Sequence, residues 1–190
     1  VREPLGVVGA IIPWNVPMLL MALKVAPALV AGNAVVVKSA EEAPLTPLRL
    51  AELCLEAGVP PGVVNVVPTD DPAPLVEAMV DDPRVRKLSF TGSTAVGRRL
   101  LAVAGRTVVN CSMELGGNSP FLVLADADLD AAVEGAMIAK MRNGGEACTA
   151  ANRFLVHESV ADAFTGRLTE AMAAVTVADG LTEGAQLGPL

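Results

Sequence analysis

The stretch GVVGAII, residues 6–12, is a short apolar run that is closed by Pro13. A continuous apolar run of this length is typical of a strand that is buried on both faces of a sheet. A longer apolar segment follows at residues 18–31, which is long enough for a helix, and residues 33–38 then form a second strand-like run, NAVVVK. The first 38 residues therefore predict a strand, a helix and a second buried strand.

The same alternation continues as far as residue 115. Further strands are predicted at 63–67, 86–90 and 107–115, and further helices at 46–58, 74–80 and 92–103. Alternating strands and helices indicate βαβ units, because parallel strands need crossover connections. The sequence therefore predicts an α/β fold, with a Rossmann-like parallel sheet that carries helices on both faces.

A second α/β unit is predicted to follow the first. The pattern resets at GGNSP, residues 116–120, and then predicts strands at 121–124 and 153–156 and helices at 129–141 and 160–175. We expect one domain over residues 1–115 and the start of a second, catalytic domain over residues 116–190. Neither end carries a capping helix or a polar tail, which predicts a segment of a longer polypeptide.

The composition argues against several classes of protein. Hydrophobic residues make up 52% of the chain and charged residues 18%, which is enough apolar material for a sizeable core. The net charge of −7 argues against nucleic acid as a partner, because phosphates are bound by Lys and Arg. The most apolar region, residues 16–37, is interrupted by proline, lysine, glycine and asparagine, which argues against a membrane span. Three cysteines form no paired framework and favour a reducing compartment, so we expect a cytoplasmic protein.

Polar residues gather where four of the predicted strands end. These clusters are Pro13-Trp14-Asn15, Lys38-Ser39-Ala40-Glu41, Thr91-Gly92-Ser93 and Glu114. In open parallel sheets, ligands bind beyond the carboxyl ends of the strands. The four clusters therefore predict a ligand site at one edge of the sheet.

Each cluster has a functional interpretation and a purely structural one. Backbone N–H groups at Gly92-Ser93 could bind a phosphate, although serine caps many helices, and the first strand lacks the G-x-G-x-x-G fingerprint of ordinary dinucleotide folds. Lys38 and Glu41 could hold ribose hydroxyls or could be solvated loop charges. The Asn15 amide could donate to a developing oxyanion or could close an Asx turn.

Glu114 lies between Met113 and Leu115 at the end of an apolar strand. Partial burial there would raise the pKa of its carboxyl group towards neutrality, as a general base requires. The alternative is a carboxylate at the sheet edge that has only a structural role.

Cys148 stands in a small, polar segment, NGGEACTA, at residues 143–150. Gly144 and Gly145 would let the backbone approach a ligand closely. The thiol is either a nucleophile or an ordinary loop cysteine. His157 is the only histidine and lies nine residues after Cys148, so a Cys–His hydrolase is a further alternative.

The other two cysteines are predicted to be packing residues. Cys54 lies on the apolar face of a predicted helix, and Cys111 lies in a predicted strand. Because the chain has no CxxC pair and a single histidine, no metal site is expected.

Five stretches together resemble the aldehyde dehydrogenase superfamily. They are PWN (13–15), VVVKSAE (35–41), FTGST (90–94), MELGGNSP (113–120) and NGGEACTAANR (143–153). Their order, with a glutamate 34 residues before a cysteine, makes the resemblance specific over essentially the whole chain. The dinucleotide domain of that family is an atypical Rossmann fold, which would account for the missing glycine fingerprint. The resemblance implies oxidation of a small aldehyde by a protein that is a homo-oligomer at full length.

The resemblance also implies a role for each matching residue. Cys148 would attack the aldehyde carbon, the Asn15 amide and the Cys148 backbone N–H would hold the oxyanion, and Glu114 would activate the water that releases the acid. The cofactor site would be lined by Ile12, Trp14, Lys38, Glu41, Gly92, Ser93 and Leu115. A carboxylate at Glu41 accepts hydrogen bonds from ribose hydroxyls and repels a 2′-phosphate, so NAD is favoured over NADP.

The substrate is indicated by two longer stretches, residues 82–94 and 140–154, which most resemble the succinate-semialdehyde branch of the family. In that branch an arginine matching Arg142 binds the substrate carboxylate, a task that suits the bidentate guanidinium. The alternative for Arg142 is a cation that stabilises a helix C-terminus.

Two positions depart from the family pattern. The second arginine of the succinate-semialdehyde branch aligns with Leu23, and the usual glutamine aligns with Glu146, whose carboxylate would raise the pKa of a nearby thiol. The main expectation is therefore NAD-dependent oxidation of an aldehyde, with succinic semialdehyde as a candidate substrate. The competing expectation is a non-catalytic, nucleotide-binding segment of such an enzyme.

Overall fold

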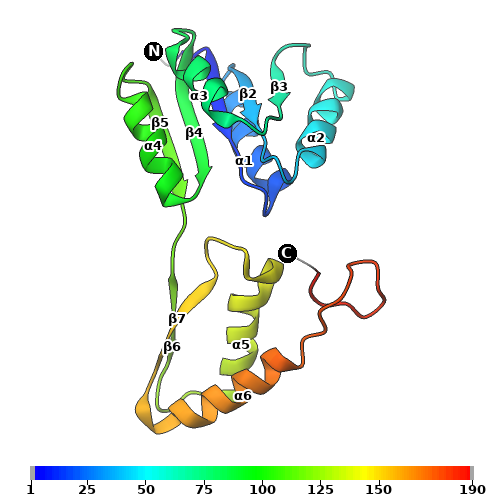
Figure 1. Cartoon of the computed structure of the whole chain (residues 1–190), viewed down its shortest axis with the longest axis vertical. Coiled ribbons are helices and arrows are strands. Elements are labelled where there is room, and N and C mark those ends of the chain that lie inside the picture. Colours follow the sequence, from blue (N-terminus) through cyan, green and yellow to red (C-terminus); the bar gives the residue numbers. More distant parts are fainter. Residues whose placement is uncertain (1–2, 189–190) are drawn as a thin grey trace. The chain divides into compact units, whose positions relative to one another are not determined.

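A computed structural model of the protein describes residues 3–188 (Figure 1). The outermost residues of the two predicted domains, 1, 2, 189 and 190, lie outside that range. The chain divides into two compact units, Val1–Leu115 and Gly116–Leu190, which are called unit 1 and unit 2 below. Among the described residues, no helix combines the length and the apolar character needed to cross a membrane.

Unit 1 is built on a five-stranded sheet in which every pair of neighbouring strands is parallel. Its strands are β1 (Val7–Ile11), β2 (Ala34–Lys38), β3 (Val64–Val67), β4 (Val85–Gly92) and β5 (Asn110–Leu115). Their order in the sheet is β3-β2-β1-β4-β5, so the direction of winding reverses between β1 and β4. The predicted parallel, Rossmann-like sheet is confirmed.

Helices cover both faces of this sheet, as the alternating pattern predicts. They are α1 (Pro17–Val30), α2 (Leu45–Glu56), α3 (Pro72–Asp81) and α4 (Thr94–Ala104). Helices α1 and α2 pack on β1, β2 and β3, whereas α3 and α4 pack on β4 and β5. Alternate residues of the first strand serve the two cores, because Val8 and Ala10 belong to the core on the α1 side and Ile11 belongs to the other.

Strand β5 buries only one of its two faces. Cys111, Met113 and Leu115 pack against the core beneath α3 and α4, while Asn110, Ser112 and Glu114 are exposed. The strand begins at Asn110 instead of the predicted 107 because Val108 adopts a left-handed backbone conformation, with φ of 56°. The polar residues of β5 therefore all lie on the face that α3 and α4 leave open.

Helix α1 carries apolar residues on its exposed side as well as on its buried side. Met21 and Val25 are buried in the core, but Met18, Leu19 and Leu23 are each more than half exposed. These three exposed residues are called the α1 stripe below.

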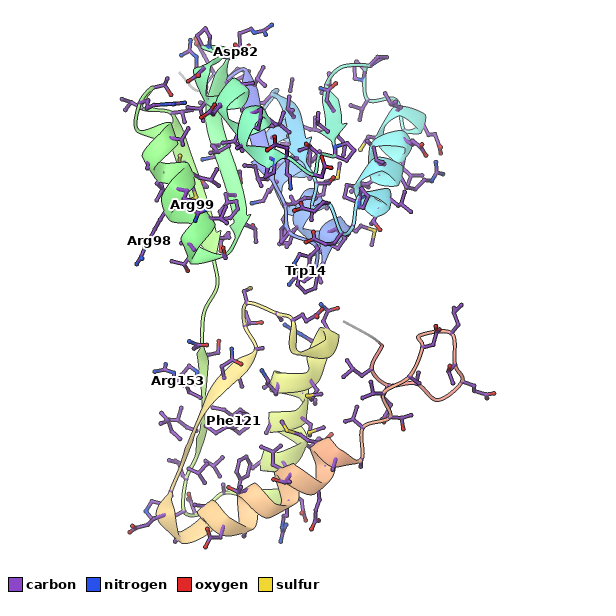
Figure 2. The ribbon with its side chains drawn as sticks, in the orientation of Figure 1. Trp14, Asp82, Arg98, Arg99, Phe121 and Arg153 are labelled. Carbon is purple, nitrogen blue, oxygen red and sulfur yellow. The ribbon has the colours of Figure 1, made fainter. Side chains whose placement is uncertain are left out.

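Unit 2 pairs two parallel strands, β6 (Ser119–Val123) and β7 (Ala151–Val156), through a crossover that contains α5 (Leu129–Met141). The short 3-10 helix η1 (Arg142–Gly145) follows α5, and η2 (Glu158–Val160) leads into α6 (Ala161–Ala173). The core is aromatic, because the rings of Phe121, Phe154 and Phe164 lie 5.6–6.5 Å apart between centroids. Figure 2 shows Phe121 and Arg153 on opposite faces of the two strands.

Candidate functional site

The four polar clusters at the strand ends lie along one edge of the unit 1 sheet. The register pairs Ile11 with both Lys38 and Phe90, and it pairs Thr91 with Glu114. Because all of these strands are parallel, their carboxyl ends share that edge. Trp14, which is 45% exposed, also lies there, and Figure 2 shows it at the opposite end of unit 1 from Asp82.

Lys38 and Glu41 form an ion pair just beyond β2. The Lys38 Nζ lies 2.7 Å from the Glu41 Oε2, with the lysine side chain buried and the carboxylate about half exposed. The hydrogen bond from Lys38 lowers the pKa of the Glu41 carboxyl group, so this group stays ionised at neutral pH. The pair therefore presents a fixed carboxylate acceptor to solvent, while the ammonium keeps donors to spare.

The N-terminus of α4 follows β4 at the same edge. Ser93 is its N-cap, and its Oγ accepts a hydrogen bond of 3.3 Å from the Val96 N–H. A Cβ added at Gly92 would lie 2.5 Å from the ring of Phe90, so packing within unit 1 already requires a glycine there. The glycine at this position is thus explained without a ligand, whereas the open N–H groups of the helix terminus suit an anion.

Two buried hydroxyl groups flank these cofactor candidates. The Oγ of Ser39 and the Oγ1 of Thr91 are buried and make no hydrogen bond within residues 3–188. A buried polar group without a partner costs roughly 1–3 kcal/mol, so it marks a place where a partner is expected. With the Lys38–Glu41 pair and the helix terminus, these groups offer the donors and acceptors that a dinucleotide needs.

Two further cofactor candidates contribute little polar surface. The side chain of Ile12 is buried in the core on the α1 side, and its N–H donates to the Lys38 carbonyl oxygen at 3.1 Å. Leu115 is half-buried against the core beneath α3 and α4. Both residues can form only apolar or backbone walls of a site.

Glu114 is exposed, which contradicts the expected partial burial. The reason is the period-two alternation of β5, which places Glu114 on the open face of that strand. Asn15, in contrast, is half-buried between β1 and α1.

Lys24 of α1 is a neighbour of Glu114 that the sequence analysis missed. Its Nζ donates to the Ser89 Oγ at 3.0 Å. Burial lowers the pKa of the Lys24 ammonium group, and the negative charge of Glu114 opposes that shift. A lysine inside an otherwise apolar helix was the signal that could have identified it.

In unit 2, Cys148 is exposed in the loop of residues 142–150. Asn143, Gly144 and Gly145 all adopt left-handed conformations, with φ of 54°, 67° and 80°. Glycine, and to a lesser degree asparagine, tolerates this conformation, which explains the NGG sequence. A turn in which the Ala150 N–H donates to the Ala147 carbonyl oxygen at 2.9 Å then presents the thiol to solvent.

Arg142 lies at the start of the same loop. Its Nη2 donates to the Oγ1 of Thr149, the residue after the cysteine, at 3.1 Å. The guanidinium is exposed and carries five N–H donors, so most of them remain for a carboxylate. The structure thus brings Arg142 and Cys148 into one loop, with the half-buried Glu146 between them in sequence.

His157 is poorly placed to pair with the thiol. Cys148 precedes β7 and His157 follows it, so the six-residue strand separates them. At about 3.3 Å per residue, that strand spans roughly 20 Å. His157 Nδ1 instead lies 2.9 Å from the Oγ of Ser159, so a Cys–His pair within this unit is contradicted.

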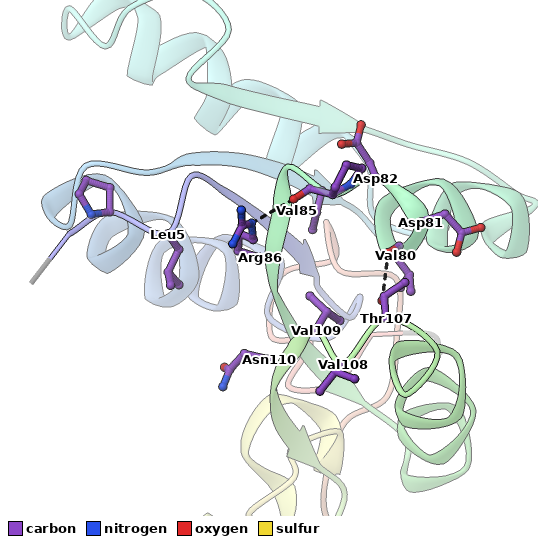
Figure 3. A pocket seen from close by; sticks show the side chains of 12 residues that line it. Leu5, Val80, Asp81, Asp82, Val85, Arg86, Thr107, Val108, Val109 and Asn110 are labelled. Atoms are coloured by element: carbon purple, nitrogen blue, oxygen red, sulfur yellow. Dashed lines mark hydrogen bonds between the residues drawn. The ribbon is translucent and has the colours of Figure 1, made fainter.

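A hollow of about 600 Å³ opens at the other edge of the unit 1 sheet (Figure 3). It is lined by the end of α3, the starts of β4 and β5, and the segment before β5. Two hydrogen bonds shape it, from Arg86 Nε to the Pro83 oxygen at 3.0 Å and from Thr107 Oγ1 to the Val80 oxygen at 3.2 Å. None of the candidate residues lines it, so its volume does not mark the reactive site.

Comparison with known proteins assigns the chain to one family. The sequence model of the aldehyde dehydrogenase family matches residues 1–190. The succinate-semialdehyde dehydrogenase of Paenarthrobacter nicotinovorans is 53% identical over 189 residues, which are 100% of this chain and 42% of that enzyme. The NADP-dependent succinate-semialdehyde dehydrogenase of Escherichia coli is 46% identical over 190 residues, which are 100% of this chain and 39% of that enzyme.

The fold agrees equally well with a solved structure. The crystal structure of succinate-semialdehyde dehydrogenase from Burkholderia pseudomallei superimposes with a TM-score of 0.95 and 53% identity, covering 100% of this chain and 39% of that one. The chain therefore spans about two-fifths of the length of the relatives it matches.

We expect iodoacetamide to modify Cys148 before Cys54 or Cys111. Cys148 is exposed and the other two are half-buried, and burial raises the pKa of the Cys111 thiol, so that less of it is thiolate at pH 8. Cys148 should therefore react clearly faster than Cys111, because its thiol is open to the reagent and the Cys111 thiol is not. Raising the pH above 9 should speed the reaction of Cys111. Peptide-resolved mass spectrometry measures all three rates, and equal rates would contradict the assignment of exposed and packed thiols.

Proposed function

Because the chain belongs to the aldehyde dehydrogenase family, we propose that the protein oxidises an aldehyde to a carboxylic acid with NAD(P), through a thioester on Cys148. The observation that carries this proposal is the exposed thiol on a left-handed glycine loop, in a chain that the family model matches from end to end. In the proposal, unit 1 is the NAD-binding domain and unit 2 is the first part of the catalytic domain.

The first step is addition of the Cys148 sulfur to the aldehyde carbon. The thiol loses its proton, the new C–S bond forms, and the carbonyl π electrons move to oxygen. The Asn15 side-chain amide and the Cys148 backbone N–H would donate to that oxyanion. NAD, when bound, would accept the hydride that leaves the same carbon.

The second step is release of the acid from the thioester. The Glu114 carboxylate would take a proton from water, the water oxygen would attack the acyl carbon, and the C–S bond would break to return the thiolate. An exposed carboxylate on the open face of β5 is accessible to the water it would activate.

The cofactor would lie along the carboxyl edge of the unit 1 sheet. Lys38 and Glu41 would bind ribose hydroxyls, and Ser93 and the α4 N-terminus would face phosphate. Trp14 would lie at the entrance of the cofactor site. The exposed, ionised Glu41 supports NAD over NADP because it would repel a 2′-phosphate. The E. coli relative uses NADP, so this preference has to be tested for this chain.

Succinic semialdehyde is the proposed substrate, with Arg142 as the anchor for its carboxylate. The free donors of the Arg142 guanidinium, in the loop that holds Cys148, support this assignment. Leu23, on the exposed α1 stripe, offers no second cation, so the proposed anchor is a single arginine.

We further propose a homo-oligomer and a cytoplasmic location for the full-length protein. Three free cysteines support a reducing compartment. A second candidate function is nucleotide binding without turnover, which the Lys38–Glu41 pair and the α4 N-terminus of unit 1 support by themselves.

The central test is formation of NADH from NAD and an aldehyde, by this chain and by a longer version with any flanking sequence encoded beside it. In the active form, Cys148→Ala should lower kcat by at least about a thousandfold, because the nucleophile is lost. Glu114→Gln should preserve a burst of one NADH per site but slow steady turnover by about a hundredfold or more.

Each alternative outcome has a clear meaning. NAD binding without NADH in either version would support the nucleotide-binding segment. Turnover that is unchanged in Cys148→Ala would rule out a thioester on Cys148.

The proposed carboxylate anchor predicts a selective effect of Arg142→Gln. The KM for succinic semialdehyde should rise by about tenfold or more, because a charge-assisted hydrogen bond is lost, while the KM for propanal stays unchanged. Arg142→Lys should rescue only part of the loss, since it cannot pair bidentately. Steady-state kinetics with both aldehydes measure this, and an equal rise for propanal would contradict a carboxylate anchor.

The cofactor preference predicts that Glu41→Ser weakens NAD binding and strengthens NADP binding. The ratio of their Kd values should shift towards NADP by about tenfold, since one repulsive charge is removed. Trp14 is the only tryptophan, so quenching of its fluorescence reports binding directly in this chain. Glu56→Ser, which removes an exposed carboxylate at the other end of α2, is the matched control and should leave the ratio unchanged. An unchanged ratio in Glu41→Ser would reject Glu41 as the selector.

A further inference from the structure

One side chain bridges the whole loop that carries Cys148. Lys140 lies in the last turn of α5, before the loop begins at Arg142. Its Nζ donates to the Oδ1 of Asn152 at 2.6 Å. Asn152 is the second residue of β7 and follows the loop, so this hydrogen bond joins the two ends of the loop.

The same bridge is tied to the neighbouring strand. The Asn152 Nδ2 donates to the Oδ1 of Asn118 at 3.1 Å, and Arg153 Nε donates to the Asn118 carbonyl oxygen at 3.2 Å. Asn118 immediately precedes β6, which begins its pairing with β7 at Ser119 and Ala151. Lys140, Asn152 and Asn118, called the lysine clamp below, therefore connect α5 to the starts of both strands.

Other contacts order parts of the loop, such as the hydrogen bond from Arg142 to Thr149 and the turn from Ala147 to Ala150, but the Lys140–Asn152 bond spans it from end to end. Three consecutive left-handed residues reverse its direction, and Cys148 and Thr149 are both exposed, so neither residue buries much apolar surface. The Lys140 side chain runs past the reversal, since a Cβ added at Gly145 would lie 3.1 Å from the Lys140 oxygen and 3.8 Å from its Cε. Lys140 is thus placed to restrain the backbone as well as to bridge it.

We propose that Lys140 is a positioning residue, which acts through Asn152 to order the Cys148 loop and to hold the sulfur in place. The proposal rests on the proposed function in that the sulfur is taken to be the nucleophile. The Lys140–Asn152 bond lies at the surface, and none of the residues of the lysine clamp belongs to the phenylalanine core of unit 2. Loss of the bond should therefore loosen the loop while unit 2 stays folded.

The first test is hydrogen exchange in this 190-residue chain, which needs neither NAD nor aldehyde. In Lys140→Met, amides of residues 143–150 should exchange about tenfold faster, because a hydrogen bond with a charged donor is lost. Amides of α6 should be unchanged. Lys140→Arg, which keeps a donor, should restore most of the protection.

Two further variants keep the test specific. Asn152→Ala removes the acceptor together with the donor to Asn118, so it should act in the same direction and at least as strongly. The double variant should lose no more protection than Asn152→Ala alone, because the Lys140–Asn152 bond is already broken there. Arg167→Met removes the ion pair between α6 and Asp130 at the far end of α5, and it should leave the loop unchanged. Unaltered exchange in Lys140→Met, additive losses, or an equal effect of Arg167→Met would overturn the proposal.

The second test is kinetic and uses the catalytically active form. Lys140→Met should lower kcat by about tenfold or more, since a displacement of about 1 Å can cost a hundredfold, while the KM for NAD is unchanged. Alkylation of Cys148 by iodoacetamide should stay within about twofold, because a misplaced thiol is still exposed. An unchanged kcat, or a parallel loss of alkylation, would overturn a positioning role. If the wild-type protein shows no turnover, the proposed function fails, and hydrogen exchange alone decides whether the clamp orders the loop.

Discussion

Parallel pairing on both sides of β1 is the constraint on which unit 1 depends. This strand pairs with β2 on one side and β4 on the other, and its residues face two separate cores. The centre is tight, because a Cβ added at Gly9 would lie 3.3 Å from both the Leu88 Cδ1 and the Met79 sulfur. Since every strand runs the same way, residues as far apart in sequence as Trp14 and Glu114 share one edge.

The thiol of unit 2 is positioned by a loop and its side-chain hydrogen bonds. Cys148 follows a helix and precedes the amino end of β7, so no strand end positions it. Two backbone hydrogen bonds shape the loop, from the Glu146 N–H to the Asn143 oxygen at 3.1 Å and from the Ala150 N–H to the Ala147 oxygen at 2.9 Å, and side chains add further restraint. Lys140 bridges the loop from outside, and Arg142 holds Thr149 from within it.

Most of the fold could be predicted from the sequence because its signals are local. The apolar runs of β1 and β2, and the helix at 129–141, lie within a residue or two of their predicted limits. The common edge of the four polar clusters also followed, since it depends only on the strands being parallel.

The details that sequence reasoning missed depend on register and on tertiary contacts. Glu114 was expected to be partly buried because its neighbours are apolar, yet the alternation along β5 exposes it. The link between Lys140 and Asn152 joins residues that are 12 apart, and the link from Asn152 to Asn118 joins residues that are 34 apart. No periodicity in the sequence encodes such pairs, because they depend on how β6 and β7 align.

The α1 stripe has a consequence for handling the protein. Met18, Leu19 and Leu23 are each more than half exposed on one helix, and each Å² of apolar surface that becomes buried is worth about 25 cal/mol. Patches of this kind promote self-association when nothing covers them. Self-association of the 190-residue chain should therefore increase with protein concentration and decrease in mild detergent. A polar substitution at Leu19 should reduce it.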